Sequence, residues 1–170
     1  DTTLNDYTKV LAKFQGEYIS VEESTLDKAT KDWKVHMIYK QLRILRNQLG
    51  SELPIISRKR ALFEKLDKEN LVILEGETGS GKSTQLPQML CEYYKIFTDP
   101  KARPIVLTQP RKLSTRSLAE RIAFEMDEKL HGFVDYVSSS GKNSLPSPDC
   151  KILVKLDRLL LDEIEEDPLL

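Results

Sequence analysis

Apolar positions in the first fifty residues recur at helical spacing. Between residues 1 and 49 they step along the chain by three and four, in two separate sets. These are Leu4, Tyr7, Leu11, Phe14 and Tyr18, followed by Val35, Ile38, Leu42, Leu45 and Leu49. Such spacing places each set on one side of a helix, and therefore predicts two amphipathic helices, each with an apolar stripe to bury. The stretch GSELPI, residues 50–55, combines a glycine stop with a proline break. It predicts a boundary between a helical N-terminal extension, 1–50, and a second domain, 51–170.

The pattern beyond this boundary changes to short apolar runs that alternate with helical segments. Apolar runs typical of strands lie at 71–75 (LVILE), 104–109, 133–138 and 151–156, and helices are predicted at 55–68, 82–94, 113–128 and 157–166. Strands separated by helices of about ten or more residues pair in parallel through crossover connections. The predicted fold class is therefore α/β, a parallel sheet sandwiched by helices. Ligands of such sheets bind at the carboxyl ends of the strands, where the loop after residue 75 would lie.

Composition and charge narrow the class of protein. The chain has 170 residues, of which 39% are hydrophobic and 31% charged, values typical of a folded domain with a charged surface. The net charge of −1 neither favours nor excludes a nucleic-acid partner. Basic side chains gather in one segment, residues 101–121, against the single acid Glu120. They are Lys101, Arg103, Arg111, Lys112, Arg116 and Arg121.

Cysteine and histidine usage gives no sign of a metal or redox site. Cys91 and Cys150 are far apart and outside any CxxC pattern, so neither a disulfide framework nor a zinc site is expected. His36 and His131 have no catalytic partner in the sequence pattern and are interpreted as structural or surface residues. No apolar run approaches the roughly 20 residues that span a bilayer, and the N-terminus lacks the pattern of a signal peptide. A cytosolic or nuclear protein without membrane association is expected.

The strongest chemical signal is the segment GETGSGKS, residues 76–83, which fits the pattern G-x-x-x-x-G-K-[ST] of a phosphate-binding loop. Glycines at 76, 79 and 81 permit positive φ, so successive N–H groups can point at a polyphosphate, and the helix predicted from Lys82 adds its N-terminal partial charge. Lys82 is expected to reach the β and γ phosphates of a nucleotide, and Ser83 to offer its hydroxyl to Mg²⁺. Thr84 would support the turn. A glycine-rich turn without a ligand is the plain alternative.

Further motifs resemble one family. The stretch GETGSGKSTQLPQ, followed by TQPRK at 108–112 and SLAERIAFEM at 117–126, resembles motifs I and Ia of the DEAH-box (DEAH/RHA) branch of superfamily 2 RNA helicases. The run from residue 53 into the glycine-rich loop is also similar to that family. The resemblance implies a P-loop, RecA-like domain, present in its N-terminal part, that uses ATP and Mg²⁺ and binds RNA.

The resemblance also implies roles for individual residues. The nucleotide would be bound by Gly76, Glu77, Thr78, Gly79, Ser80, Gly81, Lys82, Ser83 and Thr84, with Lys82 and Ser83 in the catalytic centre. Arg121 stands where the family places an arginine against the adenine ring, although an exposed helix charge would look the same. Thr108, Gln109, Pro110 and Arg111 would follow an RNA backbone without reading its sequence, so RNA binding should depend on salt.

Two departures from the family pattern stand out. Leu156-Asp157-Arg158 replaces the Thr-Asp-Gly of motif Ib, which leaves Asp157 as a less certain RNA contact that could instead cap the following helix. The segment YVSSSGKNS, 136–144, stands where an Arg-Phe-Glu element is usual. The Asp-Glu-Ala-His tetrad and the second RecA-like domain would follow residue 170. The chain is therefore expected to be the front part of a larger helicase, with little hydrolysis by itself.

Two other functions fit parts of the pattern. The altered motif Ib favours a nucleotide-binding scaffold, an interaction module whose helicase core is degenerate. A P-loop kinase or another P-loop NTPase would explain the glycine-rich loop but not TQPRK at its spacing. The sequence does not indicate protein partners, an oligomeric state or a particular RNA.

Overall fold

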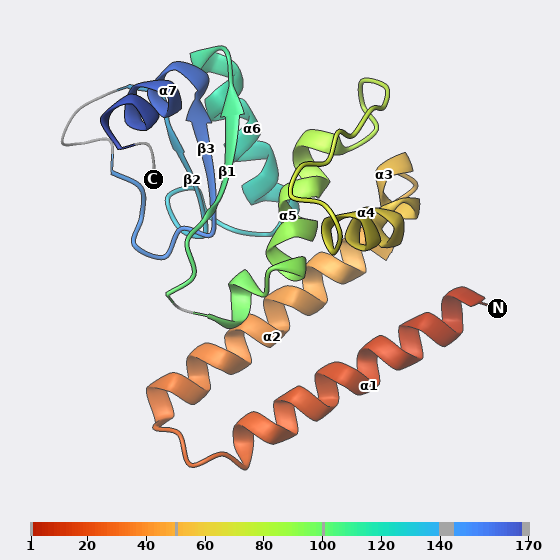
Figure 1. Ribbon diagram of the computed structural model, residues 1–170. Helices are drawn as coiled ribbons and strands as arrows, with labels where there is room; N and C mark the ends of the chain where they lie inside the picture. Colours follow the sequence, from red (N-terminus) through yellow and green to blue (C-terminus); the bar gives the residue numbers. More distant parts are fainter. Residues whose placement is uncertain (1, 50, 100, 140–144, 168–170) are drawn as a thin grey trace. The chain divides into compact units, whose positions relative to one another are not determined.

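The structure is a computed structural model that describes residues 2–49, 51–99, 101–139 and 145–167. It divides into two compact units, residues 1–46 and 47–170. The first unit holds helix α1 (Thr2–Glu22) and most of helix α2 (Lys28–Leu49), which run in opposite directions (Figure 1). The two helices predicted for the first fifty residues are thus confirmed.

The start of α2 is fixed by a local cap. Asp27 Oδ1 accepts a hydrogen bond from the backbone N–H of Thr30 at 3.0 Å, and Asp27 Oδ2 accepts one from the Thr30 hydroxyl at 2.5 Å. These bonds satisfy donors of the first turn and lower the pKa of the Asp27 carboxyl. The apolar stripe predicted for α1 is only partly buried. Phe14 is buried, whereas Leu11 and Tyr18 are 58% and 39% exposed.

The second unit is built on three parallel strands in the order β1-β3-β2 (Figure 1). They are β1 (Ile105–Gln109), β2 (Val134–Val137) and β3 (Ile152–Leu156). Ile152 is opposite Ile105 in β1 and Val134 in β2, so β3 is bonded on both sides. This central position agrees with its burial, because Ile152 and Val154 are completely buried.

Helices flank the sheet and connect its strands. Helix α6 (Lys112–Glu125) forms the crossover from β1 to β2 and packs against all three strands, while α7 (Asp157–Glu166) follows β3 directly. Helix α5 (Lys82–Tyr93) contacts β1, β3 and α6, and leads into the short 3₁₀ helix η1 (Ile96–Thr98). Two short helices, α3 (Pro54–Ser57) and α4 (Lys59–Leu66), precede α5. Among the described residues, no helix combines the length and apolar character needed to cross a bilayer.

The core of this unit lies between the sheet and α6. Ala119, Ile122 and Ala123 on α6 are each at most 3% exposed, as is Val134 on β2. Burial of a large aliphatic side chain contributes about 1.5–3 kcal/mol. The small alanines bring the helix backbone close to the strands. This packing fixes the position, relative to the sheet, of the C-terminal half of α6, which carries Arg121.

The strand predicted at residues 71–75 is absent. The segment is extended chain without ladder partners among the described residues, and Leu71 and Ile73 are 80% and 90% exposed. An apolar run becomes a strand only where a neighbouring strand accepts and donates its backbone hydrogen bonds. None of the three strands pairs with it, so the prediction of a buried strand here is wrong for this structure.

Other predicted elements are confirmed with shifted ends. The helix predicted at 55–68 is divided into α3 and α4 at Arg58, and the helix predicted at 113–128 ends at Glu125. Asp157 does not cap α7, since it is the first helical residue and Leu156 holds the cap position without a side-chain bond. Gly50 and residues 140–144 of the YVSSSGKNS departure lie outside the described residues.

Candidate functional site

The candidate site is centred on the glycine-rich loop, defined here as residues 76–83. Gly79 and Gly81 have φ of +83° and +89°, a region that other residues adopt only at a cost. Gly81 also has steric reasons to be glycine, because a Cβ there would lie 3.0 Å from both Ile55 Cγ2 and Leu53 Cδ1. Gly81 is the residue that immediately precedes α5, so the loop turns directly into the helix N-terminus.

Lys82 folds back over this loop. Its ammonium donates hydrogen bonds to the backbone carbonyls of Gly76 and Glu77, the latter at 2.7 Å, and to the Ser80 hydroxyl at 3.2 Å. The ammonium of Lys82 therefore lies between the first residues of the loop, Gly76 and Glu77, and Ser80 near its end. An anionic group entering the loop would exchange these neutral acceptors for a charged one, which makes a stronger bond.

The loop is anchored to the helices that precede it. The Ile55 N–H donates to the Ser80 carbonyl at 3.2 Å, and Ser80 itself is buried. A hollow of about 290 Å³ opens on this side, bordered by α3, by Arg58, by residues 74–75 of the preceding segment and by Gly76, Glu77, Ser80 and Lys82 of the loop. At Gly76, an added Cβ would lie 3.3 Å from Ser80 Oγ and 3.5 Å from Lys82 Nζ, so a side chain would intrude on the lysine.

A second hollow, of about 430 Å³, also borders the loop. It is lined by residues 78–84 together with Arg121 and Glu125 of α6. Arg121 Nε donates to Glu125 Oε1 at 2.7 Å, and the arginine side chain is 62% exposed. The second carboxylate oxygen, Glu125 Oε2, accepts hydrogen bonds from Gln85 Nε2 at 2.6 Å and Gln88 Nε2 at 3.4 Å. Arg121, predicted as a nucleotide contact, therefore lies beside the loop.

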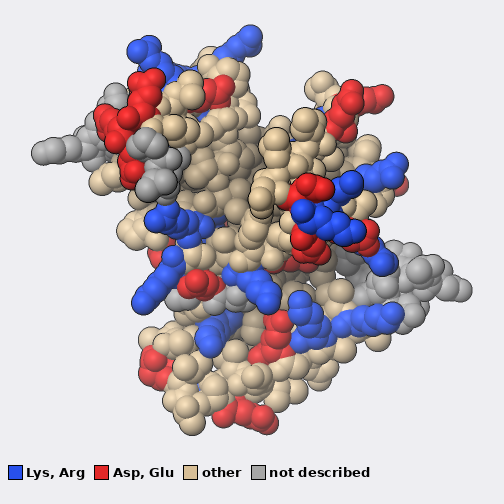
Figure 2. All heavy atoms as spheres, in the orientation of Figure 1, with Lys and Arg blue, Asp and Glu red and all other residues tan. Residues whose placement is uncertain are grey.

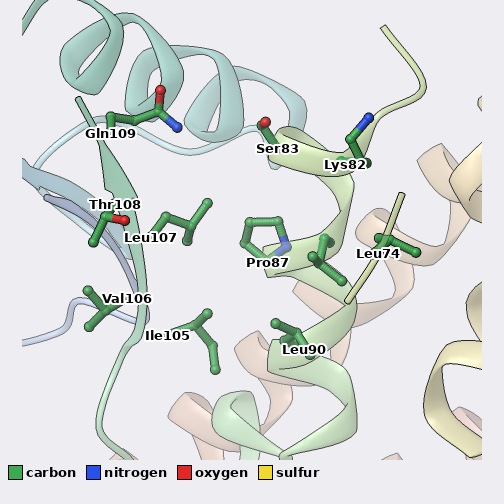
Figure 3. Close-up of a pocket in the computed structure, with 11 residues that line it drawn as sticks. Leu74, Lys82, Ser83, Pro87, Leu90, Ile105, Val106, Leu107, Thr108 and Gln109 are labelled. Atoms are coloured by element: carbon green, nitrogen blue, oxygen red, sulfur yellow. The ribbon is translucent and has the colours of Figure 1, made fainter. Parts of the chain in front are cut away.

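A third hollow, of about 340 Å³, separates α5 from β1 (Figure 3). Ile105 and Leu107 of β1 face Pro87 and Leu90 of α5 across it, while Lys82, Ser83 and Gln109 lie at its polar end (Figure 3). Leu74, from the extended segment before the loop, lines it as well. The hollow therefore joins the glycine-rich loop to the carboxyl end of β1.

The residues predicted to contact RNA gather at that carboxyl end. Gln109 is paired in register with Leu156, so Asp157 begins α7 next to the end of β1. Pro110 and Arg111 follow β1 and are exposed, and Arg111 precedes α6 with its carbonyl accepting bonds from Ser114 and Thr115. Thr108 is exposed and also lines the third hollow. The structure thus brings these five residues together at the carboxyl ends of β1 and β3, called here the carboxyl edge of the sheet.

The charge around this edge is mixed rather than basic throughout. Two of the six basic residues counted between 101 and 121 are paired with carboxylates on their own helix, Arg116 with Glu120 at 2.8 Å and Arg121 with Glu125. Acidic side chains gather over α7, which carries Asp157, Asp162, Glu163, Glu165 and Glu166 (Figure 2). Glu125 and these acids of α7 lie outside the segment 101–121, and they offset part of its positive charge.

Histidine and cysteine play no part in this site. His131 Nδ1 lies 2.8 Å from the buried Asp135 Oδ1, a carboxylate partner four residues away that the sequence interpretation did not identify. Within the described ranges, no group of three or more histidine, cysteine or acidic side chains is placed to hold a metal ion.

Comparison with known proteins adds an independent line of evidence. The chain matches no protein-family model. It is 38% identical over 122 residues to a putative ATP-dependent RNA helicase of Schizosaccharomyces pombe, which covers 69% of this chain and 10% of the relative. It is 36% identical over 141 residues to a probable ATP-dependent RNA helicase, a DHX35 homolog, of Caenorhabditis elegans, covering 78% and 19%. A pre-mRNA-splicing factor ATP-dependent RNA helicase of Arabidopsis thaliana, DEAH10, is 37% identical over 116 residues, covering 68% and 16%.

This chain is a homologue of DEAH-box ATP-dependent RNA helicases. The resemblance predicted from GETGSGKSTQLPQ and TQPRK is confirmed. The chain spans between a tenth and a fifth of the three relatives named above.

One part of the site of this DEAH-box homologue was missed by the sequence interpretation. Glu125, Gln85 and Gln88 form a bonded group behind the glycine-rich loop, although none of them was predicted to be functional. The spacing of Arg121 and Glu125, four residues apart on a helix, is a signal that could have predicted their pairing. The contact with Gln85, 40 residues away, has no such local signal.

Proposed function

We propose that this chain is the front part of an ATP-dependent RNA helicase of DEAH type. Residues 51–170 would form part of its first RecA-like, P-loop domain, and residues 1–50 a helical extension. The observation that carries the proposal is the 33–38% identity to several such helicases over more than half of the chain. The parallel α/β unit, with the glycine-rich loop at the start of α5, supports the same conclusion.

In this proposal the glycine-rich loop binds the phosphates of ATP. Its backbone N–H groups and the N-terminus of α5 would face the polyphosphate, and Lys82 would leave the carbonyls of Gly76 and Glu77 to meet the β and γ phosphates. Thr84 would support the first helical turn. Arg121, which lines the same hollow, would place its planar cation against the adenine ring.

Magnesium fits this arrangement as a companion of the nucleotide. Mg²⁺ usually takes most of its ligands from water and substrate phosphates, with only one or two from protein. The exposed Ser83, on the first turn of α5 beside Lys82, offers one hydroxyl of the suitable type. When bound, Mg²⁺ would neutralise charge that develops on the phosphates.

RNA would lie along the carboxyl edge of the sheet. Thr108, Gln109, Pro110, Arg111 and Asp157 share that edge, and the third hollow connects it with Lys82 and Ser83. Arg111 is the residue expected to contact phosphate, and Asp157 the residue least suited to it, because carboxylates repel phosphates. A change of nucleotide at the loop could thus alter the RNA contacts nearby.

Hydrolysis and movement along RNA are proposed for the full-length protein. Phosphoryl transfer of this kind needs a residue that orients the attacking water and commonly an arginine finger, which alone contributes about 10³–10⁵ in rate. Neither role is assigned to a residue between 1 and 170. The chain alone should bind nucleotide weakly and hydrolyse little.

Equilibrium titration with ATP and Mg²⁺ tests the nucleotide part of this proposal. We expect Lys82→Ala to raise the Kd of the full-length protein for ATP at least tenfold, roughly the effect of losing one charge-assisted hydrogen bond. The matched control is Lys68→Ala, since Lys68 is exposed and lines none of the three hollows. An equal Kd for wild type and Lys82→Ala would contradict the proposal.

A further inference from the structure

The Glu125 side chain joins the two helices beside the second hollow. Its carboxylate is bonded through one oxygen to Arg121 on α6, at 2.7 Å, and through the other to Gln85 and Gln88 on α5. Gln85 and Gln88 are 6% and 1% exposed, so both amides approach the carboxylate from the protein interior. The side chain of Glu125 is itself only 15% exposed.

This arrangement restricts Arg121 more than an ordinary surface ion pair would. A helix pair at spacing four contributes only about 0.3–0.5 kcal/mol when both partners are free to move. Here the acceptor is held by two amides of another helix, so the arginine is tied to a fixed group. Because the bond uses Nε, both terminal nitrogens remain for other contacts. One face of the guanidinium lies over the Phe124 ring, 5.9 Å from its centroid, so a planar ligand would stack on the other face.

The fixed arginine faces the glycine-rich loop. Arg121 and Glu125 line the second hollow together with residues 78–84, and Gln85 follows that loop by two residues on α5. A ligand whose phosphates occupied the loop would extend the rest of its structure past Arg121. A planar base can stack on a guanidinium that is already oriented, and less ordering entropy is then lost on binding.

We propose that Glu125 is a positioning residue for the base of a bound nucleoside triphosphate. It fixes the guanidinium of Arg121 relative to α5. The distance between the glycine-rich loop, which would bind the phosphates, and the guanidinium, which would contact the base, then stays constant. This inference rests on the proposed nucleotide binding. It predicts that Glu125 affects recognition of the base and leaves recognition of the phosphates unchanged.

The test compares binding of ATP with binding of inorganic tripolyphosphate, both with Mg²⁺, to the full-length protein. For Glu125→Ala we expect the Kd for ATP to rise roughly fivefold or more, the effect of losing a hydrogen-bonded charged partner, with less than about a twofold change for tripolyphosphate. The matched control is Glu120→Ala. Glu120 makes the same type of bond to Arg116, at 2.8 Å on the same helix, but lines none of the three hollows.

Four results would overturn the inference. Equal losses for ATP and tripolyphosphate would mean that Glu125 only supports the fold of the loop, and no loss for either would mean that it has no role. Equal affinity of the wild type for both ligands would mean that the glycine-rich loop binds phosphates but that the protein makes no favourable contact with the base. Binding of neither ligand by the wild type would contradict the proposed function as well.

A second variant keeps the test decisive if Glu125→Ala does not fold. Glu125→Gln preserves the volume of the side chain but replaces one carboxylate oxygen by an NH2 donor. The donors of one helix, Arg121 on α6 or Gln85 and Gln88 on α5, then face another donor and lose their acceptor. We expect it to retain a cooperative thermal transition and to reduce the advantage of ATP over tripolyphosphate. An unchanged advantage in this variant would contradict the positioning role.

Discussion

Lys155 on β3 donates a hydrogen bond to Glu163 on α7, with 2.5 Å between Lys155 Nζ and Glu163 Oε2. The lysine side chain is only 9% exposed, whereas that of the glutamate is 45% exposed. The pair connects the central strand with the helix that follows it. It also allows a charged residue to occupy a strand whose other members are apolar.

Removal of the acid should therefore destabilise the 170-residue chain. We expect Glu163→Ala to lower the free energy of unfolding by about 1–2 kcal/mol, because the Lys155 ammonium would lose its carboxylate while still buried. This expected loss is below the range for breaking a fully buried charged pair, because Glu163 is partly exposed to water. Lys155→Met should cost less than Glu163→Ala, because it removes the buried charge and keeps the length of the side chain.

Urea denaturation measures both variants, and Glu64→Ala is the control. Glu64 pairs with Arg60 at 3.0 Å on an exposed helix face, where side-chain exposures of 92% and 59% predict an effect below about 0.5 kcal/mol. A loss in Glu163→Ala no larger than that in Glu64→Ala would contradict the structural role of the pair.

The two positive-φ glycines of the loop should differ in their tolerance of alanine. Gly79→Ala meets open space and should cost only the strain of the left-handed conformation, about 1–2 kcal/mol. Gly81→Ala adds contacts of 3.0 Å with Ile55 and Leu53, and should cost about 1–3 kcal/mol more. Chemical denaturation of both variants tests the difference. Equal losses would show that α3 does not pack against the loop as described.

Neither cysteine should react while the protein is folded. Burial raises the pKa of the Cys150 thiol to about 12, and burial likewise raises the pKa of Cys91, which has no exposed surface. The reactive thiolate is therefore scarce at pH 8. Iodoacetamide labelling followed by peptide mass spectrometry should find both residues unmodified in buffer and modified in denaturant. Modification of the native protein at the rate of a free thiol would contradict the described packing.

Local patterns predicted most of the second unit. The apolar runs at 105–109 and 152–156 became strands because each has a bonded neighbour, and α7 has the predicted bounds because a strand ends and an amphipathic pattern begins at residue 157. The run at 71–75 is similarly apolar but pairs with no strand among the described residues, and Leu71 and Ile73 remain exposed. Sequence periodicity identifies residues able to form a strand, whereas pairing depends on other segments.

The candidate site likewise has a part that the sequence predicts and a part that it does not. The glycine-rich loop was predictable, because positive φ favours glycine at 79 and 81 and close packing adds a second reason at 81. The bonds that Glu125 accepts from Gln85 and Gln88 depend on how α5 packs against α6. No local pattern contains that information.

Stimulation of ATP hydrolysis by RNA, measured with the full-length protein, tests the central proposal most directly. We expect single-stranded RNA to increase the rate of the wild type, and Lys82→Ala to abolish the stimulated rate while Lys68→Ala preserves it. The stimulation should weaken as salt is raised, because phosphate contacts release counterions. A rate that RNA does not change, or one that survives Lys82→Ala, would contradict the proposal that this chain belongs to an RNA-dependent ATPase.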